Sequence, residues 1–312
     1  MADEAKCVSD PHFRAPATSR PMLRSAALAL FFLALSAAAA EVKQPFSEGR
    51  LFRISRAGIA DSFVFGTIHV GDPRVAAVAA RLDDALQRSK TLAVELVPQA
   101  ADSALGDFEQ LEDGGRLEPL VGTQAFAEVR RELASQGLAN DVIARLKPWA
   151  ALLKITRVQS SSAEKSLDAE LVAMAKARGM RMMSLELVDE QIAAFDAVPV
   201  DSQVAMLKHA LGHRDALSAT VEPTIEAWLR GDLAALAKLP DQAGRQFPGM
   251  ALHYRAFAKH VIDGRTALMH YRLFMPLREG RVFTAVGATH LYGKQGLLAM
   301  IQQDGYRVTK LW

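Results

Sequence analysis

Short apolar segments typical of β-strands lie near both ends of the chain, and long stretches of helical character separate them. Because strands flank the helical insertions on both sides, the two ends of the chain must meet in one sheet. This constraint argues against two independent domains and predicts a single folded unit. The predicted strands are residues 51–56, 62–67, 91–96, 181–187, 282–286 and 306–311.

The segment from residue 62 to residue 96 predicts a strand–helix–strand unit. Asp72 suits the N-cap of a helix, and Pro73 suits its first position. Residues 74–89 then carry apolar side chains every three or four positions. Such a unit normally joins parallel strands by a right-handed crossover. We therefore expect an α/β fold: a central mixed sheet with long helical insertions, carrying paired Glu and Gly-x-x-His strand elements.

Two Gly-x-x-His motifs follow apolar strands, one near each end of the chain. The first ends at His69 and the second at His290. Loops at the carboxyl ends of strands line the binding crevice of open α/β sheets, and imidazole there can ligate a metal or move protons near neutral pH. One such motif alone would indicate a surface or capping histidine. Two in matching contexts indicate a shared site.

Glu95 and Glu186 each lie within a short apolar strand segment. A carboxylate is costly to bury there unless a metal, a cation or hydrogen bonds compensate it. The alternative is an edge strand with the glutamate in water. Two carboxylates and two imidazoles at one end of a sheet would suit a divalent ion, or a water held between acid and base. Arg265, on a predicted helix, is a candidate contact for an anionic group.

Other candidates have simpler interpretations. His209 and His213 have the i, i+4 spacing of a metal-binding pair on a helix, but the glutamate of the metalloprotease helix motif is absent. Trp149, in Lys-Pro-Trp, is interpreted as a buried indole beside a turn. Neither set joins the predicted site.

Residues 22–41 show the order of features found in secretory signal peptides. Arg24 precedes an apolar run over residues 26–35, and small residues follow it up to Glu41. The run is shorter than the roughly 20 residues that a bilayer-spanning helix needs. We expect a signal peptide over residues 1–40, with Met22 as an alternative start, and a mature domain over 41–312. That domain would be periplasmic or secreted, without a membrane span.

Charge and cysteine content narrow the chemistry further. The chain has 37 basic and 35 acidic residues, a formal charge of +2. It therefore has no global field that attracts nucleic acid, and we expect no nucleic-acid partner. The single cysteine, Cys7, precedes the predicted cleavage point. This position excludes zinc–thiolate sites and cysteine nucleophiles from the mature domain.

The chain resembles the TraB/GumN family over about residues 50–312. The resemblance is carried by Gly-Thr-Ile-His at 66–69, Ala-Val-Glu at 93–95, Ser-Leu-Asp at 166–168, Ser-Leu-Glu at 184–186 and Gly-Ala-Thr-His at 287–290. That family is grouped with the TIKI proteases, which cut peptides with a divalent metal such as manganese or cobalt. More distant groups are the erythromycin esterases and a haem-binding lipoprotein group.

The resemblance implies an α/β sheet with paired Glu and Gly-x-x-His elements, and it carries the motif residues onto His69, Glu95, Glu186 and His290. Many members place Asn directly after the arginine that corresponds to Arg265. This chain has Thr266 there instead.

Two functional hypotheses follow. The first is a divalent-metal-dependent hydrolase of the cell envelope, peptidase-like by resemblance, acting on a peptide or small-molecule substrate. Mn, Co or Zn would be held by one or more of the four motif residues His69, Glu95, Glu186 and His290. A remaining Glu or His among them would act as the general base, and Arg265 would stabilise the oxyanion. A variant of this hypothesis is metal-free hydrolysis with His69 as the base. The second hypothesis is a non-catalytic envelope protein that binds a metal, haem or polysaccharide-related ligand in the same pocket.

Overall fold

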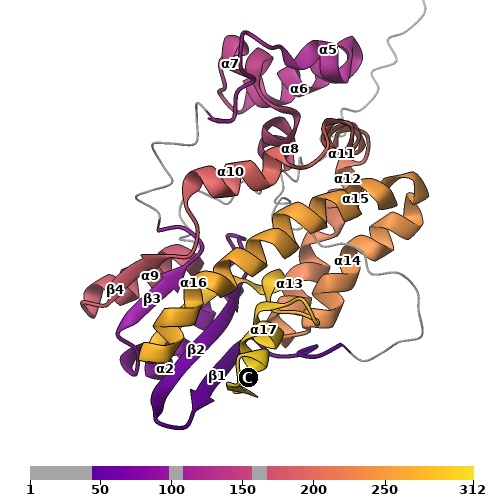
Figure 1. Ribbon diagram of the computed structural model, residues 1–312. Coiled ribbons are helices and arrows are strands. Elements are labelled where there is room, and N and C mark those ends of the chain that lie inside the picture. Colours follow the sequence, from indigo (N-terminus) through magenta and orange to yellow (C-terminus); the bar gives the residue numbers. More distant parts are fainter. Residues whose placement is uncertain (1–43, 98–107, 157–166) are drawn as a thin grey trace, which may run out of the picture.

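The computed structural model describes residues 44–97, 108–156 and 167–312. Six strands form one sheet in the order β4-β3-β5-β2-β1-β6 (Figure 1). The strands are β1 (Leu51–Arg56), β2 (Ile59–Thr67), β3 (Thr91–Val94), β4 (Arg181–Ser184), β5 (Val282–Gly287) and β6 (Arg307–Lys310). The predicted signal peptide, residues 1–40, and the alternative start Met22 lie outside the described residues.

The sheet is mixed, which confirms the predicted fold class. β4, β3, β5 and β2 are mutually parallel, whereas β1 runs antiparallel to both β2 and β6. β5 lies between β2 and β3, so a strand from the end of the chain separates two strands from its beginning. The two ends of the chain therefore share one sheet, as predicted from the positions of the strands.

Helices fill the connections between the strands. Those between β2 and β3 are α1 (Pro73–Ala76), the 3-10 helix η1 (Ala77–Leu82) and α2 (Asp83–Gln87). Between β3 and β4 lie α5 (Leu117–Val121), α6 (Thr123–Ser135), α7 (Asn140–Arg145), α8 (Pro148–Thr156) and α9 (Leu167–Ala177). Between β4 and β5 lie α10 (Val188–Asp196), α11 (Val200–Gly212), α12 (Arg214–Ala219), α13 (Val221–Arg230), α14 (Leu233–Gln246), the 3-10 helix η2 (Pro248–Met250), α15 (Ala251–Phe257), the π-helix η3 (Ala258–Gly264) and α16 (Arg265–Glu279). The 3-10 helix η4 (Ala288–His290) and α17 (Leu297–Gln303) follow β5.

The helix predicted over residues 74–89 is divided into α1, η1 and α2. Its start is as expected: the Asp72 side chain accepts a hydrogen bond from the Arg74 N–H, and Pro73 is the first helical residue. Val75, Ala79 and Leu82 are buried along one side. Spacings of three or four fit both α- and 3-10 geometry, so the apolar pattern could not reveal the change of helix type.

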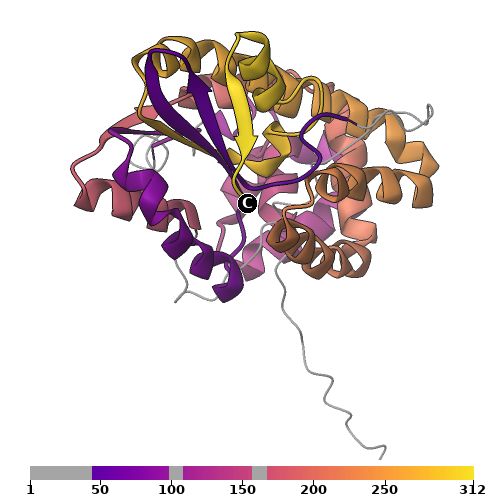
Figure 2. The ribbon, with the colours of Figure 1, turned by 90° about the horizontal axis from the view of Figure 1, so that it is seen from below.

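Two hydrophobic clusters hold the structure together. The larger one packs both faces of the sheet; Figure 2 shows α16 and α17 over one face and α2 and α9 on the other. The second lies among α5 to α8, α10, α11 and α15. The central strands are buried on both faces, with Phe63, Val64 and Phe65 each 0% exposed. This two-sided burial explains why they read as continuous apolar runs.

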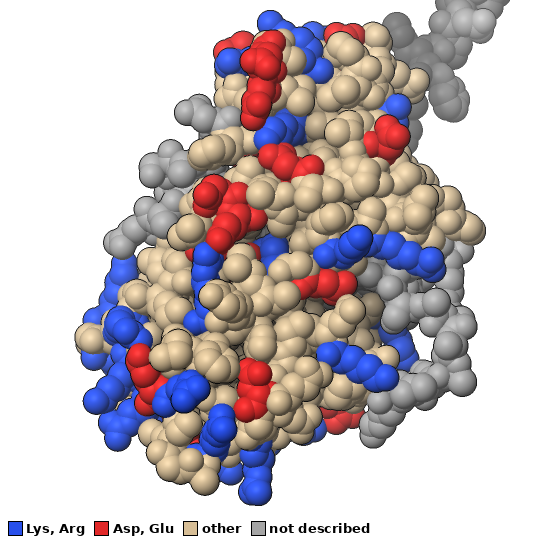
Figure 3. All heavy atoms as spheres, viewed as in Figure 1, with Lys and Arg blue, Asp and Glu red and all other residues tan. Residues whose placement is uncertain are grey.

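The surface carries mixed charge. On the face shown in Figure 3, acidic and basic side chains both occur over the helical part and over the sheet part. Among the described residues, no helix combines the length and the apolar character needed to cross a membrane.

Gly66, the first residue of the first motif, allows the packing at the carboxyl end of β2 to be tested. A Cβ there would lie 2.8 Å from Leu291 Cδ1 and 3.1 Å from the Ala288 Cα. We expect Gly66→Ala to lower the free energy of unfolding by about 1–3 kcal/mol, since overpacking must push η4 away from β2. Urea denaturation measures this change.

Gly212 offers the matched control, because an added Cβ would meet nothing within 4 Å there and the residue is helical. Gly212→Ala should leave the stability unchanged or raise it by about 0.4–1 kcal/mol. Equal effects of the two substitutions would contradict the packing role of Gly66.

Candidate functional site

The four parallel strands all end at the same edge of the sheet, and each leads into a predicted site residue. β2 leads to His69, β3 to Glu95, β4 to Glu186 and β5 to His290. The strands β3 and β4 are shorter than predicted, so both glutamates follow their strands instead of lying within them. A hydrogen bond of 3.0 Å from the Glu186 N–H to the Glu95 carbonyl holds the two segments side by side.

Arg265, the first residue of α16, lies between the two glutamates. Its Nε donates to Glu186 Oε1 at 2.8 Å, and its Nη2 donates to Glu186 Oε2 at 2.6 Å and to Glu95 Oε2 at 2.8 Å. The three side chains are 9%, 0% and 16% exposed for Arg265, Glu186 and Glu95. This burial strengthens their mutual attraction and makes an unpaired member costly.

The second oxygen of Glu95 faces β5. Its Oε1 accepts a hydrogen bond from the Gly287 N–H at 2.7 Å and lies 4.0 Å from His290 Nε2. Burial opposes ionisation of Glu95, but Arg265, the two histidines and the Gly287 N–H together hold the pKa of that carboxyl well below its ordinary value. Glu95 is therefore a carboxylate with one oxygen directed at His290.

His290 is buried, at 3% exposure, and its Nδ1 lies 2.7 Å from Thr266 Oγ1. Burial is the main reason that its pKa falls to about 4, since the imidazolium would lose its hydration. The Thr266 hydroxyl thus contacts this histidine from the position where the resemblance implied an asparagine.

His69 has a different environment from His290. Its side chain is 56% exposed, and its Nδ1 lies 3.0 Å from Asp168 Oδ2 on α9. The Asp168 carboxylate is the main cause that raises the pKa of His69 to about 9. The charge of His69 also contributes to lowering the pKa values of Glu95 and His290.

The metal predicted from the sequence does not fit this arrangement well. Both Glu186 oxygens and one Glu95 oxygen already accept hydrogen bonds from the Arg265 guanidinium, which neutralises the charge that a divalent ion would otherwise meet. Over 44–97, 108–156 and 167–312, no three His, Cys, Asp or Glu side chains converge as a metal-binding group. The ligand set therefore stays a prediction.

The remaining sequence candidates lie elsewhere. The rings of His209 and His213 stack with centroids 4.2 Å apart, and Phe247 packs edge-on against both. Trp149 is buried as predicted, and it lies in the first turn of α8, directly after the break between α7 and α8.

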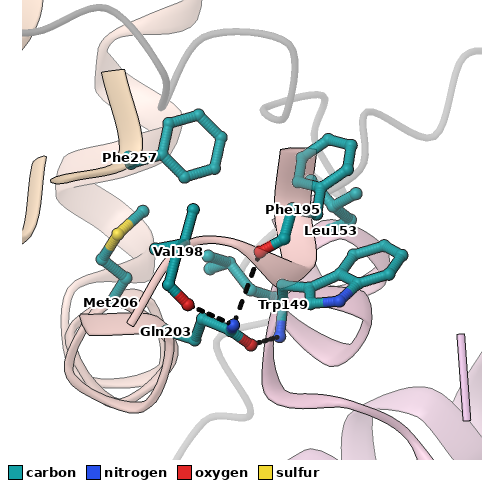
Figure 4. Close-up of a pocket in the computed structure, with 8 residues that line it drawn as sticks. Trp149, Leu153, Phe195, Val198, Gln203, Met206 and Phe257 are labelled. Carbon is teal, nitrogen blue, oxygen red and sulfur yellow. Dashed lines mark hydrogen bonds between the residues drawn. The ribbon is translucent and has the colours of Figure 1, made fainter. Parts of the chain in front are cut away.

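An apolar hollow lies within the helical part, among α8, α10, α11 and α15 (Figure 4). It has about 220 Å³ of empty space, including what opens to solvent. Trp149 and Phe195 stack on one side with ring centroids 4.9 Å apart. The Gln203 side chain bonds the Trp149 N–H and the Phe195 and Val198 carbonyls, so its amide is already occupied.

Sequence reasoning did not identify Asp168, Thr266 or the Gly287 N–H as parts of the site. Asp168 stands in the first turn of α9, where an acidic residue ordinarily complements the helix dipole. Thr266 stands inside a helical pattern, and a backbone N–H has no sequence signature. The Ser-Leu-Asp stretch that carried the family resemblance was the available signal for Asp168.

Replacing Arg265 by methionine would leave two carboxylates buried side by side. We expect Arg265→Met to lower the free energy of unfolding by about 3–5 kcal/mol at pH 7, the usual cost of removing one partner of a buried ion pair. Repulsion and burial would raise both carboxyl pKa values in the folded variant. The loss of stability caused by Arg265→Met is therefore present at pH values above 4.5, the ordinary pKa of Glu. This loss becomes smaller as the pH falls toward 4.5. Urea unfolding at pH 7 and pH 5 measures both effects.

Arg181 provides the control, because it and its partner Glu279 are 59% and 63% exposed. Arg181→Met should change stability by less than about 1 kcal/mol. Adding Glu186→Gln to Arg265→Met should recover part of the loss. A loss that does not depend on pH would show that packing, not charge, is the main contribution of Arg265.

Comparison with known proteins places the chain in a family. It is 25% identical over 259 residues to the uncharacterized protein YbaP of Shigella flexneri, a match covering 80% of this chain and 90% of the relative. YbaP of Escherichia coli strain K12 is 25% identical over 249 residues, covering 77% and 87%. No solved structure matches the chain. A model described as the TraB/PrgY/gumN family matches residues 50–310, including every residue of the candidate site. The chain therefore belongs to the TraB/PrgY/gumN family.

Proposed function

We propose that this chain is a hydrolase that activates a water molecule between Glu95 and His290. The observation that supports it most directly is the separation of 4.0 Å between Glu95 Oε1 and His290 Nε2. This distance is too long for a direct hydrogen bond and suits a single bridging water. Two acceptors on one water would direct both of its protons into the protein and its lone pairs outward, as attack on a carbonyl carbon requires.

Arg265 and Glu186 act as positioning residues in this proposal. Arg265 holds Glu95 Oε2 while the Gly287 N–H holds Oε1, so the carboxylate has little freedom to turn away from His290. Glu186 in turn fixes the Arg265 guanidinium through two hydrogen bonds. Such preorganisation lowers the cost of reaching the reactive geometry. The oxyanion role suggested for Arg265 by the sequence stays a prediction.

The two histidines would have opposite roles, because their environments move their pKa values apart. His290, with a pKa of about 4, is neutral near pH 7 and can accept a proton. His69, with a pKa of about 9, is an imidazolium there and can donate one. A pair separated in this way assigns a base and an acid. This assignment replaces the hypothesis of His69 as the base.

The proposed reaction conserves its protons. The water oxygen bonds to the carbonyl carbon as one water proton passes to His290 Nε2. Collapse of the tetrahedral intermediate breaks the carbon–nitrogen or carbon–oxygen bond, and the leaving atom takes a proton from His69. The proton on His290 then returns to His69 through solvent, which restores both residues.

We extend the proposal to the substrate, the location and the cofactor of the hydrolase. The exposed His69 and the family resemblance support a peptide or small-molecule substrate. An envelope location, periplasmic or secreted, rests on the signal peptide predicted over residues 1–40. A Mn, Co or Zn ion held by both glutamates would compete with Arg265 for the oxygens Glu186 Oε1, Glu186 Oε2 and Glu95 Oε2. Metal-free hydrolysis therefore agrees better with the hydrogen bonds of the site.

A hydrolysis assay separates these alternatives. Purified protein would be screened against p-nitrophenyl esters and fluorogenic peptides, with and without EDTA. We expect activity that survives EDTA and falls at least about 100-fold in Glu95→Gln and in His290→Gln, the usual contribution of a general base. His270→Gln is the control, since His270 pairs with Asp304 away from the four strand ends.

Other outcomes have distinct meanings. Activity lost in EDTA and restored by manganese, cobalt or zinc would replace this proposal with the metal-dependent hydrolase. No turnover of any probe, together with haem binding or a metal-induced rise in melting temperature, would favour the non-catalytic binder.

The pH profile tests the division of roles between the histidines. We expect kcat/KM to rise as His290 loses its proton near pH 4 and to fall as His69 loses its proton near pH 9. Asp168→Asn should move the alkaline limb to lower pH, because the Asp168 charge is the main cause that raises the pKa of His69. An alkaline limb that stays in place in Asp168→Asn would exclude His69 as the acid.

A further inference from the structure

The Thr266 hydroxyl lies between the His290 ring and a carbonyl of the π-helix η3. Its Oγ1 is 2.7 Å from the Ile262 carbonyl oxygen and 2.7 Å from His290 Nδ1. Thr266 is 1% exposed and His290 is 3% exposed. Solvent therefore has little access to either contact, and the three groups must share the protons that they carry.

Counting those protons favours one tautomer of His290. A hydroxyl has one proton to donate, and a carbonyl oxygen only accepts. If the Thr266 proton lies toward Ile262, the hydroxyl oxygen must accept from His290 Nδ1–H, and both short contacts are hydrogen bonds. If the Thr266 proton points toward His290, then Nδ1 must be the unprotonated nitrogen that accepts it. No proton is then left between Thr266 Oγ1 and the Ile262 carbonyl, and their 2.7 Å contact is not a hydrogen bond.

The other ring nitrogen gives no direct bond to compensate. Nε2 lies 4.0 Å from Glu95 Oε1, beyond hydrogen-bond distance. The Glu95 carboxylate attracts a proton to Nε2, but its Oε2 is paired with Arg265 and its Oε1 with the Gly287 N–H. These partners weaken that attraction, and the arrangement with two direct hydrogen bonds is favoured.

We propose that Thr266 is a positioning residue: by accepting a hydrogen bond from Nδ1 it holds His290 in the tautomer whose Nε2 has a free lone pair facing Glu95. The catalytic meaning of this contact rests on the proposed hydrolase function, whereas the tautomer itself does not. Nε2 is then the nitrogen that takes the proton from the water beside Glu95.

Two adjacent residues at the start of α16 thus contact site residues that follow different strands. Arg265 reaches the glutamates after β3 and β4, and Thr266 reaches the histidine after β5. Neighbouring residues on a helix point about 100° apart, so consecutive side chains can reach different parts of one site. The π-helix η3 ends directly before them, at Gly264, and π-helical turns often occur at functional sites.

Histidine tautomers can be read directly by ¹⁵N nuclear magnetic resonance. Protein labelled at histidine would be studied at pH 7 as wild type, Thr266→Ser and Thr266→Val, with the His290 signal assigned by its loss in His290→Asn. We expect a proton on Nδ1 and a bare Nε2 in the wild type and in Thr266→Ser. Thr266→Val keeps the shape of threonine and removes the hydroxyl, so the proton should move to Nε2.

Either of two spectra would overturn the inference: a proton on Nε2 in the wild type, or an unchanged tautomer in Thr266→Val. The wild-type spectrum decides the matter even if the valine variant does not fold.

Activity adds a separate measurement. With any probe that the wild type hydrolyses, Thr266→Val should lower kcat about 100-fold with little change in KM, and Thr266→Ser should retain activity. The expected tautomer without hydrolysis of any probe would support the Thr266 contact while the proposed function fails. Hydrolysis with the proton on Nε2 would overturn the Thr266 inference and the role of Nε2 as the base, and would leave only the assignment of the chain as a hydrolase.

Discussion

The buried contact of Arg265 with Glu95 and Glu186 is the interaction on which the rest of the site depends. Two neighbouring parallel strands end in carboxylates, which repel each other and lose hydration when covered. A guanidinium can bind both, because its planar fork presents several donors at fixed angles. The arginine comes from the start of α16, so the same contact fixes that helix against the sheet. The long helical run from α15 through η3 to α16 then connects the helical cluster with the site.

The strand order explains why such distant residues meet. β5 enters the sheet between β2 and β3, so the strand that leads to His290 has the strands leading to His69 and Glu95 as its neighbours. The parallel direction of β4, β3, β5 and β2 brings their carboxyl ends to one edge. In open α/β sheets that edge is where ligands bind, since strand order and connections leave a crevice there. A hairpin arrangement would have placed alternate strand ends on opposite edges.

Much of this fold could be predicted from the sequence, because the central strands are short apolar runs buried on both faces and bounded by turn residues. The meeting of the two chain ends followed from where those runs lie.

The partners of the site residues could not be predicted in the same way. Asp168 and Thr266 lie in helices, where an acid in the first turn or a threonine within the helix has a local explanation. Arg265 was a candidate, but its contact with both glutamates depends on how α16 packs, which no local pattern encodes. The division of the predicted 74–89 helix into three segments could not be predicted either, because the spacing of apolar residues does not distinguish α-helices from 3-10 helices.

The two Gly-x-x-His motifs look equivalent in the sequence and are chemically different in the fold. The absence of a side chain at Gly66 lets η4 pack closely against β2, whereas Gly287 contributes its N–H to Glu95. The first motif leads to an exposed histidine beside a carboxylate, and the second to a buried histidine beside a hydroxyl. A carboxylate partner stabilises the imidazolium, whereas burial beside a neutral hydroxyl favours the uncharged ring. Repetition of one motif on parallel strands therefore supplies two imidazoles to one edge, and the helices that cover each strand end set their different protonation. That asymmetry suits acid–base chemistry on a single substrate, because one histidine is a donor and the other an acceptor over the whole pH range between their two pKa values.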